Sequence, residues 1–498
     1  MKAVFVLFDS LNRHMLGCYG GRRVPTPNFD RLAARSAVHD AHYVGSLPCM
    51  PARRDLLTGR LTFLHRSWGP LEPFDNAFPE LLRDHGTYTH LVTDHYHYWE
   101  DGGATYHNRY SSFEFVRGQE SDAWKAMVQP PWERLREKYH AAQFDSGGRS
   151  KFRPYMVNRE FIRDEQDFPS VQCFRHGLEF LEKNRTADNW LLQIETFDPH
   201  EPFYAPERFK QAFATAWNGP IRDWPPYGRL DELPHEAAEL RANYYALVAL
   251  CDFLLGQLLD YFDHFDLWRD TALVVTTDHG FLLGEHDFWA KNRMHVYQEV
   301  AHIPLLVHDP RQPLAGRSNR LSQAIDVAPT FCDLFGVAPP PETEGRSLLA
   351  PTDREAVLFG YFGGAVNITD GHYTYHRFPE ALETQEIFQY TVMPAHLNRP
   401  FTTEELSHAT LAPPFRWTKQ VPLLKVPVTE RSPMYYGHGP GALLENDTRL
   451  YDIDADPGQA TPLRNPATEA RLTELMRLMM LANDAPREAF VRLAIDPP

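Results

Sequence analysis

The chain has 498 residues, of which 43% are hydrophobic and 13% aromatic, so it is long and apolar enough for a large folded core. Its formal net charge of −16 argues against nucleic-acid binding and against an anionic membrane surface, since both need clustered Lys and Arg. Five cysteines, at positions 18, 49, 173, 251 and 332, lack the spacing of a metal site or a disulfide framework.

In chain order, short apolar runs alternate with amphipathic stretches. The runs cover residues 3–8, 90–93, 190–197, 271–277 and 303–307, and the clearest helical patterns cover 171–183 and 240–262. Continuous apolar runs are typical of strands buried on both faces of a parallel sheet, and their alternation with helices predicts an α/β fold. The first run is too short for a signal peptide, so we expect a cytoplasmic protein, and no window predicts a membrane span.

The pattern of apolar runs and the composition change near residue 355. Short strands are expected at 356–361, 372–376 and 449–452, and a helix at 469–482, around a stretch rich in Pro, Thr and aromatic residues. This pattern predicts two domains, a larger one over residues 1–354 and a smaller α+β domain over 355–498. The aromatic stretch at 378–441 is a candidate for closing a pocket or for subunit contacts.

Acidic residues follow four of the apolar runs, at Asp9, Asp94, Asp198 and Asp278. A single Asp in this position is commonly a turn residue or a helix cap. Four of them, each with a His or Ser nearby, fit a shared site better, because ligands bind beyond the carboxyl ends of parallel strands.

The segment Cys49-Met50-Pro51-Ala52-Arg53 is the strongest local signal. Pro51 would sit in the first turn of a helix, which would place Cys49 at the helix N-terminus and Arg53 one turn later. The residues alone suggest a thiol activated by the helix dipole and the guanidinium. The alternative is an ordinary buried cysteine, which is common.

This segment, with Leu-Leu-Thr-Gly after it, resembles the signature of the sulfatase family. Four further motifs resemble the family in the same order, and together they span most of the chain: Asp9 with residues 16–20 and 25–32, residues 198–203, residues 278–291, and residues 450–458. The resemblance implies the alkaline phosphatase-like fold. In that fold, helices sandwich a large mixed, mostly parallel sheet, and a smaller C-terminal α+β domain carries an antiparallel sheet.

The resemblance also implies the site. Cys49 would be oxidised to formylglycine (3-oxoalanine) by a maturation enzyme, and one divalent metal ion would be held beside it. The implied metal ligands are Asp9, Ser10, Cys49, Asp278 and His279. The implied catalytic residues are Cys49, Arg53, His97, His200 and Lys291, with Arg53 holding the formylglycine and His200 as a general acid. His95 could take the place of His97 by a one-residue shift and is otherwise expected to bind substrate. Apart from the resemblance, Arg109 and the aromatic residues around it could line a substrate pocket, with loop packing as the alternative.

Three positions depart from the family pattern. Ser10 stands where many members have Asp, and His279 where calcium-binding members often have Asn. Imidazole suits manganese or zinc better than calcium, so calcium is expected first, with manganese or zinc as the alternatives that His279 favours. Asp94 stands where members often have a sulfate-binding Lys. The loss of that cation should disfavour a doubly charged phosphate monoester most.

The sequence therefore predicts hydrolysis of a small-molecule sulfate monoester, as in the arylsulfatases. The alternative is a phosphonate monoester hydrolase or phosphodiesterase that uses the same site. A third hypothesis, a non-catalytic binder of sulfated ligands, is disfavoured by the intact Cys49, Arg53, His200 and Lys291. The alcohol part of the substrate stays open, and a homo-oligomer is compatible with the sequence.

Overall fold

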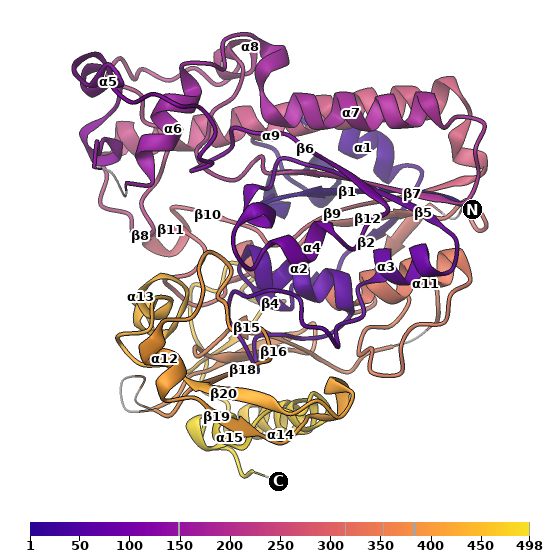
Figure 1. Cartoon of the computed structure of the whole chain (residues 1–498), viewed down its shortest axis with the longest axis vertical. Coiled ribbons are helices and arrows are strands. Elements are labelled where there is room, and N and C mark those ends of the chain that lie inside the picture. Colours follow the sequence, from indigo (N-terminus) through magenta and orange to yellow (C-terminus); the bar gives the residue numbers. More distant parts are fainter. Residues whose placement is uncertain (148–149, 314, 352, 381, 383–384, 498) are drawn as a thin grey trace.

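A computed structural model of the chain describes residues 1–147, 150–313, 315–351, 353–380, 382 and 385–497. Its centre is an eight-stranded sheet in the order β13-β2-β12-β9-β1-β7-β5-β6 (Figure 1). Strand β12 is antiparallel to both neighbours, and the other pairs are parallel. The predicted α/β class with a mixed, mostly parallel sheet is confirmed. The strands are β1 (Lys2–Phe8), β2 (Ala37–His39), β5 (Tyr88–Thr93), β6 (Ser112–Phe115), β7 (Trp190–Thr196), β9 (Thr271–Thr277), β12 (Leu305–His308) and β13 (Gly316–Ser318).

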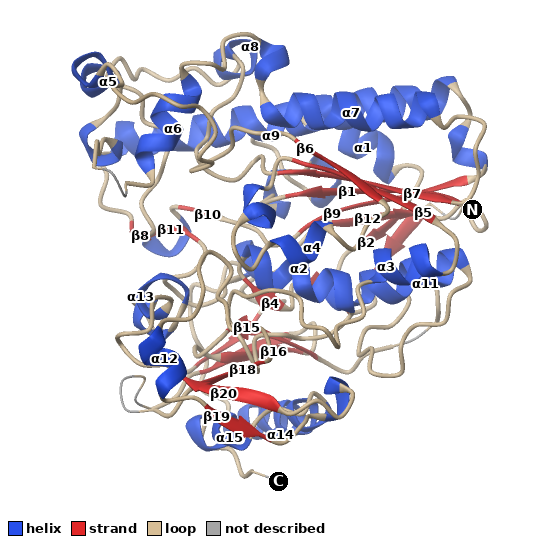
Figure 2. Cartoon of the chain, in the orientation of Figure 1, coloured by secondary structure: helices blue, strands red, loops and turns tan. Residues whose placement is uncertain are grey.

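Helices cover both faces of this sheet, which explains the continuous apolar runs (Figure 2). Along β1, the side chains of Val4, Val6 and Phe8 join one core, with α1, α7 and α9. The alternate residues Ala3, Phe5 and Leu7 join the opposite core, with α2, α3 and α11. These helices are α1 (Pro27–Ala33), α2 (Cys49–Thr58), α3 (Phe78–Asp84), α7 (Pro169–Lys183), α9 (Pro234–His264) and α11 (Val327–Phe335).

The five predicted apolar runs correspond to β1, β5, β7, β9 and β12. The last strand begins at Leu305, two residues later than expected. The remaining strands of the sheet, β2, β6 and β13, were not predicted. They are short, and β6 and β13 are partly or largely exposed, so neither produces a continuous apolar run.

Helix α9 is long and apolar enough to cross a membrane by length and composition alone, which the sequence reading did not expect. Within the fold, however, 67% of its most apolar window is buried, and the helix packs against α1, α7 and α8 (Glu207–Gln211). A core helix of this kind passes the same composition test. Its apolar surface is therefore accounted for by the core beside β1.

The C-terminal region forms a second sheet in the order β21-β17-β16-β15-β4. Its strands are β15 (Val357–Tyr361), β16 (Val366–Thr369), β17 (Tyr373–Arg377), β21 (Arg449–Asp452) and β4 (Ser46–Leu47). The first four pair antiparallel, as predicted, but β4 comes from the N-terminal region and pairs parallel with β15. The division at 354/355 stays a prediction, although the smaller sheet is not built from residues 355–498 alone.

A third sheet lies beyond it, in the order β18-β20-β19. Helix α14 contributes Leu472, Met476 and Met480, spaced by four residues, to the core under the five-stranded sheet.

The 378–441 stretch includes residues 381 and 383–384, which lie outside the described residues. The elements of this region are β18 (Phe388–Thr391), β19 (Thr410–Ala412), β20 (Leu423–Pro427), α12 (Thr403–Ser407), α13 (Tyr435–His438), α14 (Pro466–Ala482) and α15 (Arg487–Arg492). The other elements are β3 (His42–Tyr43), β8 (Gly228–Arg229), β10 (Leu282–Leu283), β11 (Phe288–Ala290), β14 (Ser322–Gln323), α4 (Ala104–His107), α5 (Trp132–Lys138), α6 (Phe152–Arg159) and α10 (Gln298–Ala301).

Candidate active site

The ends of β1 and β9 place two carboxylates side by side. These strands run parallel with Phe8 beside Thr277, so Asp9 and Asp278 leave the sheet at the same level. The backbone amide of Ser10 donates a hydrogen bond to Asp278 Oδ1 at 3.0 Å, and both carboxylates are fully buried. The structure therefore confirms that these strand ends meet at one point.

Cys49 begins helix α2 opposite these carboxylates, with Pro51 in the first turn as predicted. Its Sγ lies 3.3 Å from His279 Nε2 and 4.0 Å from His200 Nε2. Every residue of α2 is buried. The structure thus brings together Cys49 with two of the histidines expected around it.

The structure contradicts the simpler expectation of an activated thiolate. Burial and the neighbouring Asp9 carboxylate raise the pKa of the Cys49 thiol well above its usual value. The positive charges of Lys291 and Arg53 act in the opposite direction but do not outweigh burial. A thiol that stays protonated at neutral pH is a poor nucleophile. The unmodified cysteine is therefore unsuited to direct attack.

Arg53 lies within a cluster of acidic side chains. Its guanidinium contacts three buried carboxylates: Nη2 lies 2.9 Å from Asp9 Oδ2, Nε 2.7 Å from Glu195 Oε1 and Nη1 2.6 Å from Asp278 Oδ2. The expected role of Arg53 in holding the modified Cys49 stays a prediction; beside the unmodified cysteine its donors face the acidic cluster. Its first role is to offset the repulsion among these carboxylates.

The charge of this cluster is incompletely balanced. Burial raises the pKa of Asp278 to about 7, and the nearby negative charge of Asp9 adds to the shift. Burial also favours a raised pKa for Asp9, but the charges of Arg53, His200, Lys291 and His279 together keep the pKa of Asp9 well below its usual value. Asp9 is thus ionised, whereas the pKa of Asp278 lies close to neutral pH. A further cation would allow both to ionise.

Four buried residues could hold that cation. Ligand atoms of Asp9, Cys49, Asp278 and His279 all lie within 4.8 Å of one another. Asp9 Oδ2 is fully buried and accepts no hydrogen bond, because its contact of 2.9 Å with Arg53 Nη2 is an ion pair only. The Nδ1 atom of His279 donates to Gly280 O at 2.9 Å, which leaves Nε2 with a free lone pair toward the group. These residues fit a divalent metal ion.

Ser10 and Lys291 lie at the side of this group. The Ser10 hydroxyl donates to Asp9 Oδ1 at 2.8 Å and accepts from Lys291 Nζ at 2.9 Å. Ser10 therefore links the lysine to the carboxylate of Asp9, and its expected role as a metal ligand stays a prediction. Lys291 follows β11 directly, and although burial favours a lowered pKa, the neighbouring Cys49 and Glu201 raise it. The lysine stays charged.

His200 comes from the loop after β7. Its Nδ1 donates to the Glu201 carbonyl oxygen at 2.7 Å, which directs an unprotonated Nε2 toward Cys49. Burial and the charge of Lys291 lower the pKa of His200 well below its usual value. In this structure His200 is neutral and can accept a proton. It can act as the expected general acid only after doing so.

The two histidines after β5 have different environments. His95 is fully buried, with Nε2 at 3.2 Å from Met50 Sδ and its ring stacked on Phe197. His97 is partly exposed, and its Nδ1 lies 2.7 Å from Glu100 Oε2. Burial favours a lowered pKa for His97, but Glu100 raises it. His97 is therefore the charged member of the pair, and His95 a packed neutral ring.

Asp94 does not replace a substrate-binding lysine. Its carboxylate accepts hydrogen bonds from the Phe197 amide at 2.7 Å and from Gln119 Nε2 at 3.0 Å. Burial and the nearby Asp198 raise its pKa well above the usual value. Asp94 is thus a buried scaffold residue that holds the loop carrying His200. An Asp94→Lys exchange would break this scaffold.

Arg109 is not brought to the site. Its Nη1 lies 3.0 Å from Glu80 Oε1 on α3, and its Nε donates to Thr105 O at 3.0 Å. These contacts tie the end of α4 to α3, so the structure gives Arg109 a structural role instead of the expected substrate contact.

Sequence reasoning missed several buried polar residues. Glu195 lies within β7 and accepts hydrogen bonds from Arg53 and from the Tyr98 hydroxyl. Glu201 is 1% exposed and accepts from the Tyr227 hydroxyl at 2.6 Å. The signal for Glu195 was its acidic side chain inside an otherwise apolar run, since a buried carboxylate needs a partner.

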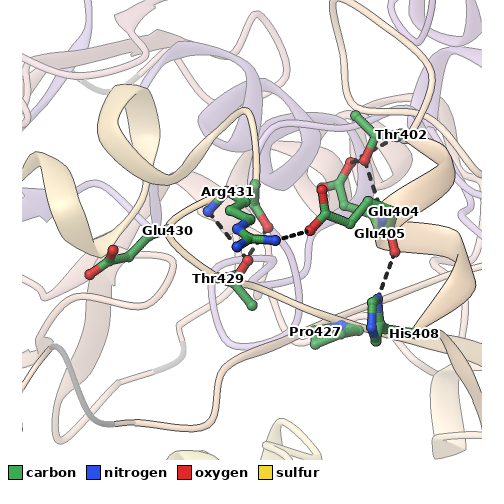
Figure 3. A pocket seen from close by; sticks show the side chains of 9 residues that line it. Thr402, Glu404, Glu405, His408, Pro427, Thr429, Glu430 and Arg431 are labelled. Atoms are coloured by element: carbon green, nitrogen blue, oxygen red, sulfur yellow. Dashed lines mark hydrogen bonds and ion pairs between the residues drawn. The ribbon is translucent and has the colours of Figure 1, made fainter.

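Two surface cavities, of about 520 and 570 Å³, lie in the C-terminal region. Figure 3 shows the first, where Arg431 pairs with Glu404 beside α12. The residues described as lining either cavity include none of the residues placed around Cys49. The candidate active site is thus a closed cluster of polar side chains at the strand ends, away from these hollows.

Comparison with known families agrees with this arrangement. The family described as "Sulfatase" matches residues 2–337, two thirds of the chain. A second family, described as "N-sulphoglucosamine sulphohydrolase, C-terminal", matches residues 284–402. The first match covers Asp9, Cys49 and Asp278, and the second begins just before Lys291.

Individual proteins show the same likeness. Human iduronate 2-sulfatase is 26% identical over 377 residues, which cover 68% of this chain and 64% of that enzyme, slightly less than two thirds of its length. A protein solved in complex with its substrate D-glucosamine-2-N,6-O-disulfate has a TM-score of 0.66 at 15% identity, covering 97% of this chain and 98% of that one. The phosphonate monoester hydrolase of Agrobacterium radiobacter has a TM-score of 0.64 at 18% identity, covering 97% and 96%. Both of these solved structures share the fold of this chain.

Proposed function

Because the chain belongs to the sulfatase family, we propose that it hydrolyses a sulfate monoester at the cluster around Cys49. One observation carries the proposal: a cysteine with a raised pKa lies inside a group of metal-ligating side chains. Oxidation of Cys49 to formylglycine would explain it.

Two groups would complete the site. Formylglycine made from Cys49 would supply a hydrated aldehyde as the nucleophile, and a divalent ion would supply positive charge for the sulfuryl oxygens. Asp9, Asp278 and His279 would hold the ion. Arg53 keeps the two carboxylates in place through its contacts of 2.9 and 2.6 Å.

The chain's own residues provide the remaining steps. The unprotonated Nε2 of His200, 4.0 Å from Cys49 Sγ, can take a proton from the nucleophile at position 49. Lys291 stays charged and lies 2.9 Å from Ser10 Oγ, where it can contact an ester oxygen. His97 carries a raised pKa and can supply a proton to the departing alcohol. Burial of the cluster excludes water and strengthens each of these interactions.

Charge balance favours an ester with one negative charge. The carboxylates of Asp9, Asp278 and Glu195 outnumber the buried cations Arg53 and Lys291 by one. A divalent ion would turn this into one net positive charge. A sulfate monoester, which carries one negative charge, would neutralise it, whereas a phosphate monoester approaches two.

A phosphonate monoester or a phosphate diester also carries one negative charge, so the substrate of the alternative function would neutralise the site equally well. The likeness in fold to a phosphonate monoester hydrolase supports keeping this alternative. Turnover of matched 4-nitrophenyl sulfate, phosphate and phenylphosphonate esters decides between them, with Cys49→Ala as the baseline. Sulfate preferred by about 100-fold, roughly 2.7 kcal/mol in the barrier, supports the sulfatase. Preference for the phosphonate favours the alternative.

The types of ligand atom in the cluster also indicate which metal ion it would bind. Calcium prefers oxygen ligands only, whereas imidazole suits manganese or zinc. Burial and Lys291 lower the pKa of His279 to about 3, so its Nε2 is available to a metal at neutral pH. We therefore propose manganese or zinc ahead of calcium. Metal-free protein reloaded with each ion, with affinity measured by calorimetry, tests this order.

A further inference from the structure

A C-terminal segment is fixed directly beside Lys291. Asn292 Nδ2 donates to the Gly437 carbonyl at 3.2 Å, and Arg293 Nη1 donates to the Tyr436 carbonyl at 3.0 Å. These two donors immediately follow the lysine in sequence. Helix α13, which lies about 145 residues later in the chain, is therefore held against the catalytic region.

This docking brings three rings into contact. His438, the last residue of α13, stacks on Trp68 with ring centroids 4.2 Å apart and an angle of 15°. Trp68 in turn meets His97 edge to face, with centroids 5.2 Å apart. The rings come from the loop after α2, the loop after β5 and the C-terminal region. His438 and Trp68 thus lie next to a residue that we place in the reaction.

Several polar atoms around these rings have no hydrogen-bond partner. Burial without a hydrogen bond is costly, so such atoms in a native site commonly await a ligand or ordered water. The Trp68 nitrogen can only donate, whereas the Glu201 carboxylate, when ionised, can only accept. The buried atoms without a hydrogen bond are Trp68 Nε1, His438 Nδ1, Asn292 Oδ1, the Tyr361 hydroxyl oxygen and Glu201 Oε2, the last of which lies 3.2 Å from His200 Nδ1.

These atoms belong to the surroundings of Cys49 and Lys291. Asn292 follows the lysine, and Tyr361 pairs across the sheet with Leu47, two residues before Cys49. Glu201 follows His200 and is 1% exposed, and Asn292 is 4% exposed. Donors and acceptors thus both occur among residues that adjoin Cys49, His200 and Lys291 in sequence or in strand pairing.

We propose that Trp68 and His438 determine specificity by hydrogen bonding to the alcohol half of the ester, and that this half is an uncharged polyol, such as a sugar. The inference rests on the proposed ester hydrolase function. Hydroxyl groups both donate and accept, so a polyol can satisfy the mixed set of unpartnered atoms that a plain hydrocarbon or aryl group would leave unpaired.

The surrounding charges agree with an uncharged alcohol. Burial and the charge of His97 lower the pKa of His438 to about 3, so its ring is neutral and suits a hydroxyl better than a second sulfate. The net charge of −16 adds a general repulsion of polysulfated chains.

Ring-retaining variants test the proposal in the matured full-length protein. Trp68→Phe and His438→Phe keep the stacked rings but remove the polar nitrogens. Their matched control is Trp217→Phe, because Trp217 is also partly exposed and stacks on a histidine, His235. The probes are glucose 6-sulfate and cyclohexylmethyl sulfate, which share a six-membered ring and differ in the hydroxyl groups. Sulfate release gives kcat/KM for each.

The wild type should prefer glucose 6-sulfate, and each ring variant should reduce that preference by about 10-fold while changing cyclohexylmethyl sulfate by less than about 2-fold. Trp217→Phe should leave both values unchanged. An unaltered preference in both ring variants overturns the inference. Failure of the wild type on both probes and on the 4-nitrophenyl esters overturns the proposed function instead. If the phosphonate series is preferred, the same two alcohols are compared as methylphosphonate esters.

Discussion

Leu47 pairs with Tyr361 in a parallel ladder, two residues before Cys49. This pairing makes β4, the segment leading into the nucleophile, an edge strand of the C-terminal sheet. Asp9 and Asp278 belong to the central sheet. The distance between the nucleophile and its metal ligands is therefore set by how the two sheets pack together.

Replacement of Arg53 by Met should destabilise the protein strongly. Three buried carboxylates would lose their shared cation, and removing one partner of a buried charge pair typically costs about 3–5 kcal/mol. Urea unfolding of metal-free protein measures this loss. The control is Arg208→Met, which breaks an exposed pair with Glu165 and should cost less than about 1 kcal/mol. Equal stability of the two variants would contradict the role given to Arg53.

Exchange of Ser10 for Asp should strengthen metal binding and favour calcium. The new carboxylate would add a hard oxygen ligand beside Asp9, and the positive φ of 62° at this position is one that Asp tolerates better than most residues. We expect calcium affinity to rise by about 10-fold or more in calorimetric titrations. Ser10→Ala serves as the control, which should show no such gain. A calcium affinity unchanged in Ser10→Asp would show that position 10 cannot reach the ion.

Loss of Cys49 should abolish turnover while leaving the fold intact. Cys49→Ala should lower kcat by about 1,000-fold or more, because it removes the group that becomes the nucleophile. The side chain removed is small, so the melting temperature should fall by only a few degrees. Mass spectrometry of the wild-type peptide containing position 49 shows whether the cysteine was converted. Wild-type activity in a sample with wholly unmodified Cys49 would refute the formylglycine mechanism.

Asp252 should make stability depend on pH near neutrality. Its carboxylate accepts hydrogen bonds from the Asn28 and Phe29 amides at the start of α1, but burial raises its pKa to about 6 from the usual 3.8. The folded state therefore holds this proton more tightly than the unfolded state, so the contribution of Asp252 improves as pH falls from above 6 to below 4.

The variant Asp252→Asn removes this titration. Its stability relative to the wild type should be more favourable at pH 7.5 than at pH 4.5, by about 1–3 kcal/mol. Urea midpoints for both proteins across this range measure the difference. A constant difference across the range would mean that Asp252 is ionised in the folded protein throughout.

Much of the fold and part of the site could be read from the chain. The apolar runs before Asp9 and Asp278 identified the inner strands, because strands covered on both faces need apolar residues throughout. Pro51 predicted the helix that begins at Cys49, because proline is common in the first turn of a helix. In each case the information lies within about ten consecutive residues.

The partners of the long polar side chains could not be read in this way. Arg53 meets Glu195, 142 residues later, and Arg109 meets Glu80 instead of the substrate site. Asp94 occupies the end of a strand, as Asp9 does, but its side chain is held under the loop after β7.

The sequence by itself determined which residues end the central strands and which cysteine starts the buried helix, because strand and helix patterns are local. Only the tertiary structure decided that Ser10 bridges to Lys291 and that His438 reaches Trp68. The physical reason is that a buried polar group is stabilised by whichever partner the packing of distant segments brings within hydrogen-bond distance. Local sequence patterns do not specify that partner.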